Sequence, residues 1–381
     1  MLLILIPGRG RIRMGRFFRY LLGLLVLFSV RIGGAEEMAL VYDQAGRKVI
    51  IPTRIERVVG LSSSLRYIVY LQALNKVVGI EGIEKRNSSG PINATGRLYW
   101  LAIRDRIKDI PTIGEGGPGK LPDLERLLSV RPEVVFTFER DNAEFIQRKT
   151  NIPVLVISYA GTEGFEIKDI KETFSFLGKI LKKEKRAEEL NQYLDYCIED
   201  LTRRTSPPPN FKIPTVYIGA ISARGTHGIT STESHYPPLQ WIRVKNVADN
   251  LGGKGHIFVD KEKLLAWDPD YLFIDAGGIY LVNEDYLKNK EFYQKLKAVR
   301  EGKVYTVFPY NFYRTNLEVL IANAYFIGKI IYPQDFIEVD PDEKMREVLT
   351  KFLGKDVYGL LKQSYKGFGK VEFNKAGIIV R

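Results

Sequence analysis

Residues 123–136 read DLERLLSVRPEVVF, and residues 260–273 read DKEKLLAWDPDYLF. The two stretches align without a gap and share an initial Asp, a Glu two residues later, a Leu-Leu pair and a Pro. Each predicts a short helix with an acidic N-cap, broken by Pro and followed directly by a buried β-strand. An internal repeat of this kind predicts two related lobes in one chain.

Around both copies, short β-branched runs alternate with longer amphipathic segments, the pattern of parallel strands joined by crossover helices. The expected strands are residues 57–61, 76–80, 134–138, 154–157, 215–218, 271–274 and 303–307. The expected helices include residues 62–74, 315–330 and 341–364. The fold class is therefore α/β, with two Rossmann-like lobes and a ligand cleft between them.

The segment between the lobes has its own composition. Residues 168–204 contain no Pro and one Gly, and apolar residues such as Ile170, Phe174 and Leu177 recur at helical spacing. This pattern indicates a long helix, or two in series, ending at the Pro-rich residues 206–210. The predicted organisation is a first lobe at 36–167, a bridging helix at 168–206, and a second lobe with C-terminal helices at 207–381.

The first 35 residues are typical of a secretory signal peptide. Arginines precede an apolar run at residues 20–28, which is too short to cross a bilayer, and Gly33, Gly34 and Ala35 offer a cleavage site. Met14 is an alternative start, and an uncleaved membrane anchor is the alternative interpretation. We expect a protein secreted across the cytoplasmic membrane, periplasmic or at the cell surface.

Composition excludes several classes of protein. The 381 residues are 45% apolar, too many for a disordered chain. The net charge of +12 suggests nucleic-acid binding, but six arginines in residues 1–35 supply half of it, and the remainder has 51 Lys and Arg against 45 acids. The single cysteine, Cys197, excludes an intramolecular disulfide and a site built from several thiolates.

Several short segments together resemble a known family. Residues 43–52, 57–61, 77–80, 111–114 and 124–135 are similar to the amino-terminal lobe of the substrate-binding proteins that serve iron–siderophore and cobalamin ABC importers. The likeness continues through Asn246–Asp249 and the block from Glu262 to Asp270, and covers roughly residues 40–335.

The resemblance implies two lobes bridged by one rigid helix, with little hinge closure. It also implies an ABC permease and its ATPase as partners, which the family meets through one surface Glu per lobe. The matching residues are Glu125 and Glu262, one in each copy of the repeat. The alternative is that both are solvated acids near helix starts, where the helix dipole favours negative charge.

Ligands of doubly wound lobes lie beyond the carboxyl ends of the strands, so the loops there are the place to look for binding residues. These loops are rich in Arg and aromatic residues, which suit a large, anionic or oxygen-rich ligand. The alternative for each arginine is a surface salt bridge. The candidate ligand-binding residues are Arg66, Arg97, Tyr99, Trp100, Arg140, Arg224, His227, Tyr236, Tyr310, Tyr313 and Arg314.

A bare metal site is disfavoured, because the chain has three histidines and one cysteine. The expected function is a monomeric, non-enzymatic receptor without a cofactor that delivers an iron(III)-siderophore or related metal chelate to an ABC permease. Cobalamin or another corrinoid and a nickel chelate are alternatives within the class. A secreted two-lobed α/β enzyme is the alternative outside it, although no nucleophile–base set is evident. Sequence alone does not name the chelate.

Overall fold

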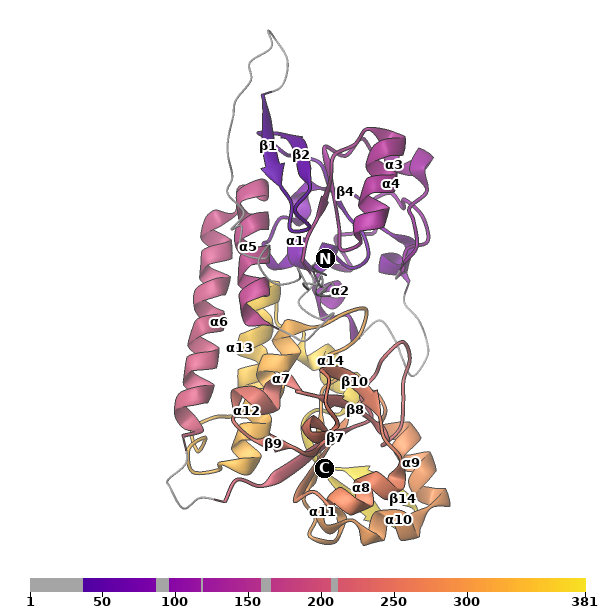
Figure 1. The fold of residues 1–381 in the computed structure, drawn as a ribbon, viewed down its shortest axis with the longest axis vertical. Helices are drawn as coiled ribbons and strands as arrows, with labels where there is room; N and C mark the ends of the chain where they lie inside the picture. The colour runs from indigo at the N-terminus through magenta and orange to yellow at the C-terminus, as the bar shows by residue number, and fades with distance from the viewer. Residues whose placement is uncertain (1–36, 87–95, 118, 159–165, 207–211) are drawn as a thin grey trace, which may run out of the picture.

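The computed structural model describes residues 37–86, 96–117, 119–158, 166–206 and 212–381. Two α/β lobes lie one above the other, with helices α5 and α6 along one side (Figure 1). The predicted signal peptide lies outside the described residues. In the part of the chain that the structure describes, none of the helices combines the length and apolar composition needed to span a bilayer.

The first lobe is built on a four-stranded parallel sheet with the order β4-β3-β5-β6. A separate antiparallel hairpin, β1–β2, precedes it. The strands are β1 (Met38–Tyr42), β2 (Lys48–Pro52), β3 (Val58–Gly60), β4 (Val77–Gly79), β5 (Val134–Thr137) and β6 (Val154–Val156). The helices are α1 (Leu65–Tyr70), α2 (Leu98–Ile103), α3 (Leu124–Ser129) and α4 (Arg140–Thr150), with 3-10 turns at Leu74–Lys76 and Gly82–Lys85.

The second lobe has a six-stranded sheet with the order β14-β13-β12-β11-β7-β9, and a separate antiparallel strand pair, β8 and β10. Its strands are β7 (Thr215–Gly219), β8 (Ser231–Ser234), β9 (Lys245–Asn246), β10 (Gly255–Phe258), β11 (Tyr271–Asp275), β12 (Val304–Val307), β13 (Gly369–Asn374) and β14 (Gly377–Val380). Its helices are α7 (Pro237–Trp241), α8 (Lys261–Trp267), α9 (Ile279–Lys288), α10 (Lys290–Lys295), α11 (Lys297–Arg300), α12 (Leu317–Ile331), α13 (Pro341–Leu353) and α14 (Tyr358–Tyr365), with a 3-10 turn at Val247–Leu251.

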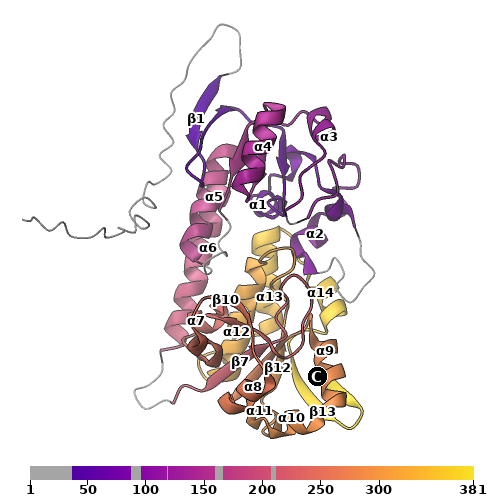
Figure 2. The same ribbon diagram turned by 45° about the vertical axis from the view of Figure 1, so that its right-hand side comes forward.

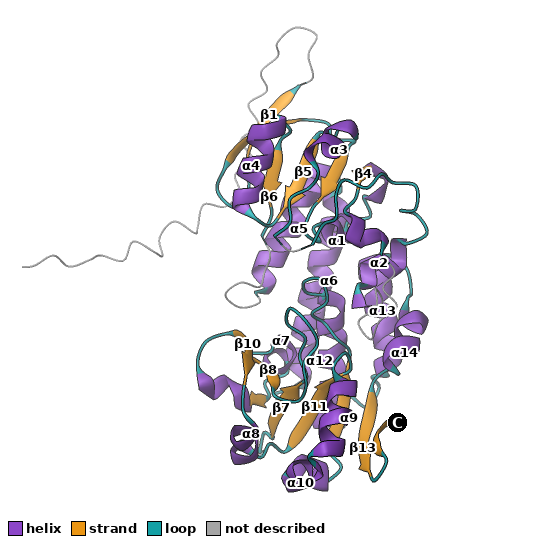
Figure 3. Ribbon diagram, turned by 90° about the vertical axis from the view of Figure 1, so that its right-hand side faces the viewer, coloured by secondary structure: helices purple, strands orange, loops and turns teal. Residues whose placement is uncertain are grey.

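The two sheets share one topology. In the first lobe β3 pairs with β4 and β5, and β5 pairs with β6; in the second, β7 pairs with β9 and β11, and β11 pairs with β12, all in parallel. The repeated helices α3 and α8 precede the corresponding strands β5 and β11. Their N-caps are Asp123 and Asp260, whose side chains accept backbone N–H groups of the first turn. The sequence repeat therefore predicted the two lobes, which form separate groups of strands in Figure 3.

The bridging segment at residues 168–206 is predicted as one long helix or two in series, and the structure has two, α5 (Ile167–Leu181) and α6 (Glu184–Arg204). Their antiparallel pairing was not predicted. The chain reverses at Lys182, which adopts a left-handed conformation with φ of 57°. Asn191 of α6 donates to the Lys171 carbonyl of α5 at 3.2 Å, which fixes the antiparallel register. Helix α6 alone runs alongside both lobes (Figure 1).

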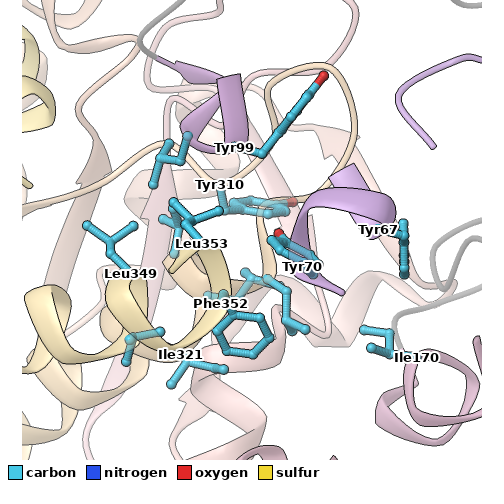
Figure 4. Close-up of a cluster of buried hydrophobic side chains, with 14 of the residues drawn as sticks. Tyr67, Tyr70, Tyr99, Ile170, Tyr310, Ile321, Leu349, Phe352 and Leu353 are labelled. Atoms are coloured by element: carbon cyan, nitrogen blue, oxygen red, sulfur yellow. The ribbon is translucent and has the colours of Figure 1, made fainter. Parts of the chain in front are cut away.

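The lobes are joined by more than α6. Helix α13 comes from the C-terminal part of the chain but lies between the lobes (Figure 2). Its Phe352 packs against Tyr70 of α1 at 5.3 Å and against Phe174 of α5 at 6.5 Å, measured between ring centroids. Figure 4 shows Phe352 and Tyr70 in one cluster with Ile321 and Leu349, and Phe174 belongs to the same buried core. One hydrophobic core therefore runs from the first lobe through the helical layer into the second.

The C-terminal hairpin β13–β14 was not predicted. It extends the second sheet because β13 pairs antiparallel with β12. The Asn-Lys-Ala-Gly turn at residues 374–377 was the available signal, and its Gly377 has a φ of 138° that side chains rarely adopt.

Candidate functional site

Loops at the carboxyl ends of the strands of both lobes meet between the lobes. The loop at residues 308–316, which follows β12, reaches across to the first lobe. Tyr313 donates from its hydroxyl to Glu81 Oε2 at 2.9 Å, and Arg314 forms an ion pair with Glu139 at 2.5 Å. The Arg314 guanidinium also lies 4.6 Å from the centre of the Phe138 ring. We call the Tyr313–Glu81 and Arg314–Glu139 pairs the cross-lobe latch.

Arg66 is buried beneath this latch. Its Nη2 atom donates to the carbonyls of Phe312 and Tyr313 at 3.2 and 3.0 Å, and its guanidinium lies 4.9 Å from the centre of the Tyr99 ring. With 2% of its surface exposed, Arg66 holds the 308–316 loop against the first lobe. In this structure its place is the interface between the lobes, not an open ligand surface.

Arg97, Tyr99 and Trp100 are also buried, around Glu84. Arg97 and Tyr99 donate to the Glu84 carboxylate at 3.1 and 2.6 Å, and the Trp100 indole donates to the Glu84 carbonyl at 2.6 Å. These three predicted binding residues therefore form an internal cluster of the first lobe. Glu84, which sequence reasoning missed, organises it.

Two further candidates are buried in the second lobe. Tyr236 is completely buried, and its hydroxyl accepts a hydrogen bond from Asn323 at 3.1 Å. Tyr310 packs on it with ring centroids 5.6 Å apart. Both rings are packed in the core beneath the interlobe surface.

The remaining candidates have solvent access. Arg140 is exposed and pairs with Glu144 one helical turn away, at 2.9 Å. Arg224 is exposed in the loop after β7, where its φ is 55°. His227 is half-buried, and its ring centroid lies 5.9 Å from that of His256 and 4.9 Å from that of Phe258. The structure thus gathers Tyr313 and Arg314 at the latch but does not bring all eleven candidates to one surface.

Three carboxyl groups near the strand ends were missed by sequence reasoning: Glu81 and Asp275 are buried, and Glu233 is half-buried. Burial raises the pKa values of Glu81, Glu233 and Asp275 to about 8 in each case. Hydrogen bonds from Tyr313 and Ser62 oppose this shift at Glu81, and one from the Gly277 backbone opposes it at Asp275. Each group has one buried oxygen without a hydrogen-bond partner. The available signal was an acid at or just after a buried apolar strand.

A cavity of about 210 Å³ lies between the start of α5 and the second lobe. Figure 2 shows α7 and β10 below α5. Polar and charged side chains dominate its lining. The lining residues are Glu166, Ile167, Lys168, Glu233, Ser234, His235, Gln240, Trp241, Lys254 and Gly255.

Among the described residues, no group of three or more His, Cys, Asp or Glu side chains is arranged to hold a metal ion. Cys197 is buried in α6, and burial raises the pKa of its thiol to about 11.

The acids expected to face a permease are both exposed. Glu125 lies in the first turn of α3 and Glu262 in the first turn of α8. Because the two lobes share one topology, these residues occupy corresponding places in the two lobes.

Two lobes of the same topology around an interlobe site are the arrangement of a two-lobed ligand-binding protein. The family model of the periplasmic binding proteins matches residues 58–310, and the chain belongs to this family. A curated relative, the molybdate-binding protein MolA of Haemophilus influenzae, is 24% identical over 334 residues, which cover 82% of this chain and 90% of the relative.

Solved structures agree on the fold. MolA of H. influenzae with bound molybdate has a TM-score of 0.62 at 20% identity, covering 83% of this chain and 98% of that one. The TroA-like periplasmic binding protein FepB of Veillonella parvula has a TM-score of 0.60 at 18% identity, covering 82% and 96%. The first is the periplasmic binding protein of an ABC transporter, and the second is a periplasmic binding protein.

Proposed function

We propose that this chain is the extracytoplasmic receptor of an ABC importer and that it captures a compact, oxygen-rich anion containing a metal, of which molybdate is the model. The observation that carries this proposal is that side chains of the protein fill most of the space between the lobes. Arg66, Tyr99 and Tyr310, expected to surround a large ligand, are at most 6% exposed. The interlobe cavity of about 210 Å³ is smaller than the roughly 300–1,000 Å³ that holds drug-sized ligands.

The relationship to MolA supports the same choice of ligand, since that relative is a molybdate-binding protein. An oxyanion needs hydrogen-bond donors and positive charge rather than extended apolar walls. The predominantly polar lining of the cavity fits that need.

The second candidate is an iron(III)-siderophore or related metal chelate, with corrinoids and nickel chelates as variants. Arg140, at the start of α4, and Arg224, in the loop after β7, supply exposed guanidinium groups, and Tyr313 and Arg314 lie at the cross-lobe latch. A bulky chelate requires the loop at residues 308–316 to move, because this loop now contacts the first lobe. That movement breaks the cross-lobe latch, and its cost lowers the net affinity for the chelate.

Isothermal titration calorimetry with molybdate, ferrichrome, ferric citrate and cyanocobalamin separates the two candidates. We expect a saturable heat with molybdate and none with cobalamin. Saturable binding of ferrichrome or ferric citrate, without binding of molybdate, overturns the oxyanion assignment in favour of the chelate.

We further propose that Glu125 and Glu262 contact the permease. Both are exposed at corresponding places of two similar lobes, as a two-fold symmetric partner requires. The variant Glu125→Lys/Glu262→Lys is expected to bind ligand normally and to abolish uptake in cells. The matched control is Glu284→Lys, at an exposed acid of α9. Equal uptake by both variants would contradict the assignment.

A further inference from the structure

The cavity between α5 and the second lobe has one wall from each side of the interlobe space. The start of α5 contributes Glu166–Lys168. The antiparallel pair of strands β8 and β10 contributes Glu233, Ser234 and Gly255. A group bound there contacts both sides at once. This is the property a binding protein needs if ligand is to change the contact between its lobes.

Positive charge is available at this cavity. Lys168 and Lys254 both line it, and each pairs with an exposed glutamate; Lys168 pairs with Glu172, one helical turn away, at 3.8 Å. Lys254 pairs with Glu166 at 3.4 Å, with 48% and 62% of the two side chains exposed, so solvent weakens the pair and Lys254 can turn to a ligand at little cost. The amino-terminal end of α5 adds the positive end of a 15-residue helix, and its N-cap Glu166 makes no capping bond with its side chain.

Glu233 supplies the second, independent observation. Its Oε2 atom is buried without a hydrogen-bond partner, although the side chain lines a polar cavity. Among the residues that the structure describes, no cation forms an ion pair with Glu233, and burial raises the pKa of its carboxyl group to about 8. At pH 7 the group is therefore a neutral carboxylic acid, which can donate a hydrogen bond.

We infer that this cavity is the oxyanion site, in which Lys168 and Lys254 supply positive charge and the unpartnered Glu233 carboxyl group supplies a hydrogen bond. The inference rests on the proposed function, because it assigns the proposed ligand to one cavity. The volume of about 210 Å³ leaves room for a tetrahedral oxyanion with water, and a neutral Glu233 leaves the lining with net positive charge.

The protonation of Glu233 makes binding depend on pH. The titratable groups around it are His256, directly opposite on β10, Tyr236 on the loop after β8, and Glu166, Lys168, His235 and Lys254 at the cavity. Burial lowers the pKa of His256, and burial raises that of Tyr236 far above neutrality. Between pH 7.5 and 9.5 Glu233 is accordingly the group that changes charge. It becomes an anion as the pH rises and then repels the ligand.

Calorimetric titration of the full chain with molybdate tests the site, because molybdate stays a dianion over this range. We expect Lys254→Gln to weaken binding at pH 7.5 about tenfold. The control Lys288→Gln, at an exposed lysine of α9 outside the cavity, is expected to stay within twofold of the wild type. Inorganic phosphate and citrate, titrated in parallel, distinguish inorganic from organic oxyanions.

The variant Glu233→Gln keeps a donor of the same size but cannot ionise. We expect it to bind molybdate within about threefold of the wild type at pH 7.5. Above pH 8 the wild type should lose affinity about tenfold per pH unit, as one linked proton requires, whereas Glu233→Gln should not. The inference is overturned if Lys254→Gln binds molybdate as the wild type does, or if Glu233→Gln keeps the steep pH dependence.

These outcomes separate the site from the function. The wild type can bind molybdate while Lys254→Gln keeps the wild-type affinity and Glu233→Gln keeps the wild-type pH dependence. In that case the site is wrong and the proposed ligand class stands. If the wild type binds an iron chelate and no oxyanion, the proposed ligand class fails as well.

Discussion

Glu84 shows how a charged residue is kept inside the first lobe. Burial raises the pKa of its carboxyl group, while the nearby Arg97 guanidinium and the Tyr99 hydroxyl act in the opposite direction. Both members of the Glu84–Arg97 pair are almost completely buried, at 1% and 4% side-chain exposure. Each partner offsets the desolvation of the other, so removing one leaves a buried charge without compensation.

We expect Arg97→Met to lower the free energy of unfolding by about 3–5 kcal/mol, the usual cost of breaking a buried pair. Urea denaturation followed by circular dichroism measures this. The double variant Arg97→Met/Glu84→Gln removes both charges and should recover part of the loss. Arg140→Met is the matched control, since Arg140 pairs with Glu144 in solvent and should leave stability unchanged. Equal losses in Arg97→Met and Arg140→Met would contradict this account.

The same cluster shows what residue types alone can predict. An arginine beside two large rings at residues 97–100 suits an oxygen-rich ligand and a buried carboxylate equally well. Thirteen residues separate Glu84 from Arg97, and only the folded chain brings them together. Local sequence therefore predicted a cation among aromatic rings at Arg97, Tyr99 and Trp100. It did not predict that Glu84 is the partner of Arg97 in the structure.

Asp275 links the stability of the protein to pH. Its pKa rises from 3.8 to about 8 on folding, because burial disfavours the charged form. Between these two values the unfolded chain loses the proton and the folded chain keeps it. The contribution of Asp275 to the free energy of unfolding is therefore fully present below about pH 4. It declines as the pH rises to 8, by about 1.4 kcal/mol per pH unit at most. We expect Asp275→Asn to reduce the fall in unfolding free energy between pH 5 and 8 in urea titrations, and an unchanged slope would contradict this.

Among the elements, the α5–α6 pair depends on a close approach of the two helices. A Cβ atom built on Gly178 of α5 would lie 2.7 Å from the Cβ of Ala187 of α6. No side chain fits there without a shift of one helix. The antiparallel pairing was not predicted because its turn consists of Lys182 and Lys183, without the Gly or Pro that usually marks a helix end.

We expect Gly178→Ala to destabilise the protein by about 1–3 kcal/mol through overpacking, against the gain of helix propensity. Gly359→Ala is the matched control. It lies in α14, nothing lies within 4 Å of its added Cβ, and the change should be neutral or stabilising by up to about 1 kcal/mol. Thermal unfolding of both variants measures the difference. Stabilisation by both would mean that α5 and α6 do not pack this closely.

Whole-molecule behaviour follows from the way the lobes are connected. The sequence repeat predicted both lobes, because a helix start and a buried strand are local features that recur at α3–β5 and α8–β11. It did not predict that α13 packs between them, because this contact joins residues about 280 positions apart, such as Tyr70 and Phe352. A large apolar interface between lobes disfavours independent motion and couples their stabilities.

The shared core predicts that both lobes unfold in one transition. Calorimetry should give equal van't Hoff and calorimetric enthalpies, and amide exchange in β5 and β11 should report the same free energy of global opening.

Phe352→Ala removes a buried ring that contacts Tyr70, Phe174 and Tyr193, at a cost of about 3–5 kcal/mol. Because the ring belongs to the core shared by both lobes, we expect amide-exchange protection in β5 and β11 to fall together. Phe258→Ala is the control: Phe258 is 60% exposed, and its loss should change the protection of neither strand. Two separate transitions in the wild type, or loss of protection in one sheet only, would show that the lobes fold independently and that α13 is merely attached to one of them.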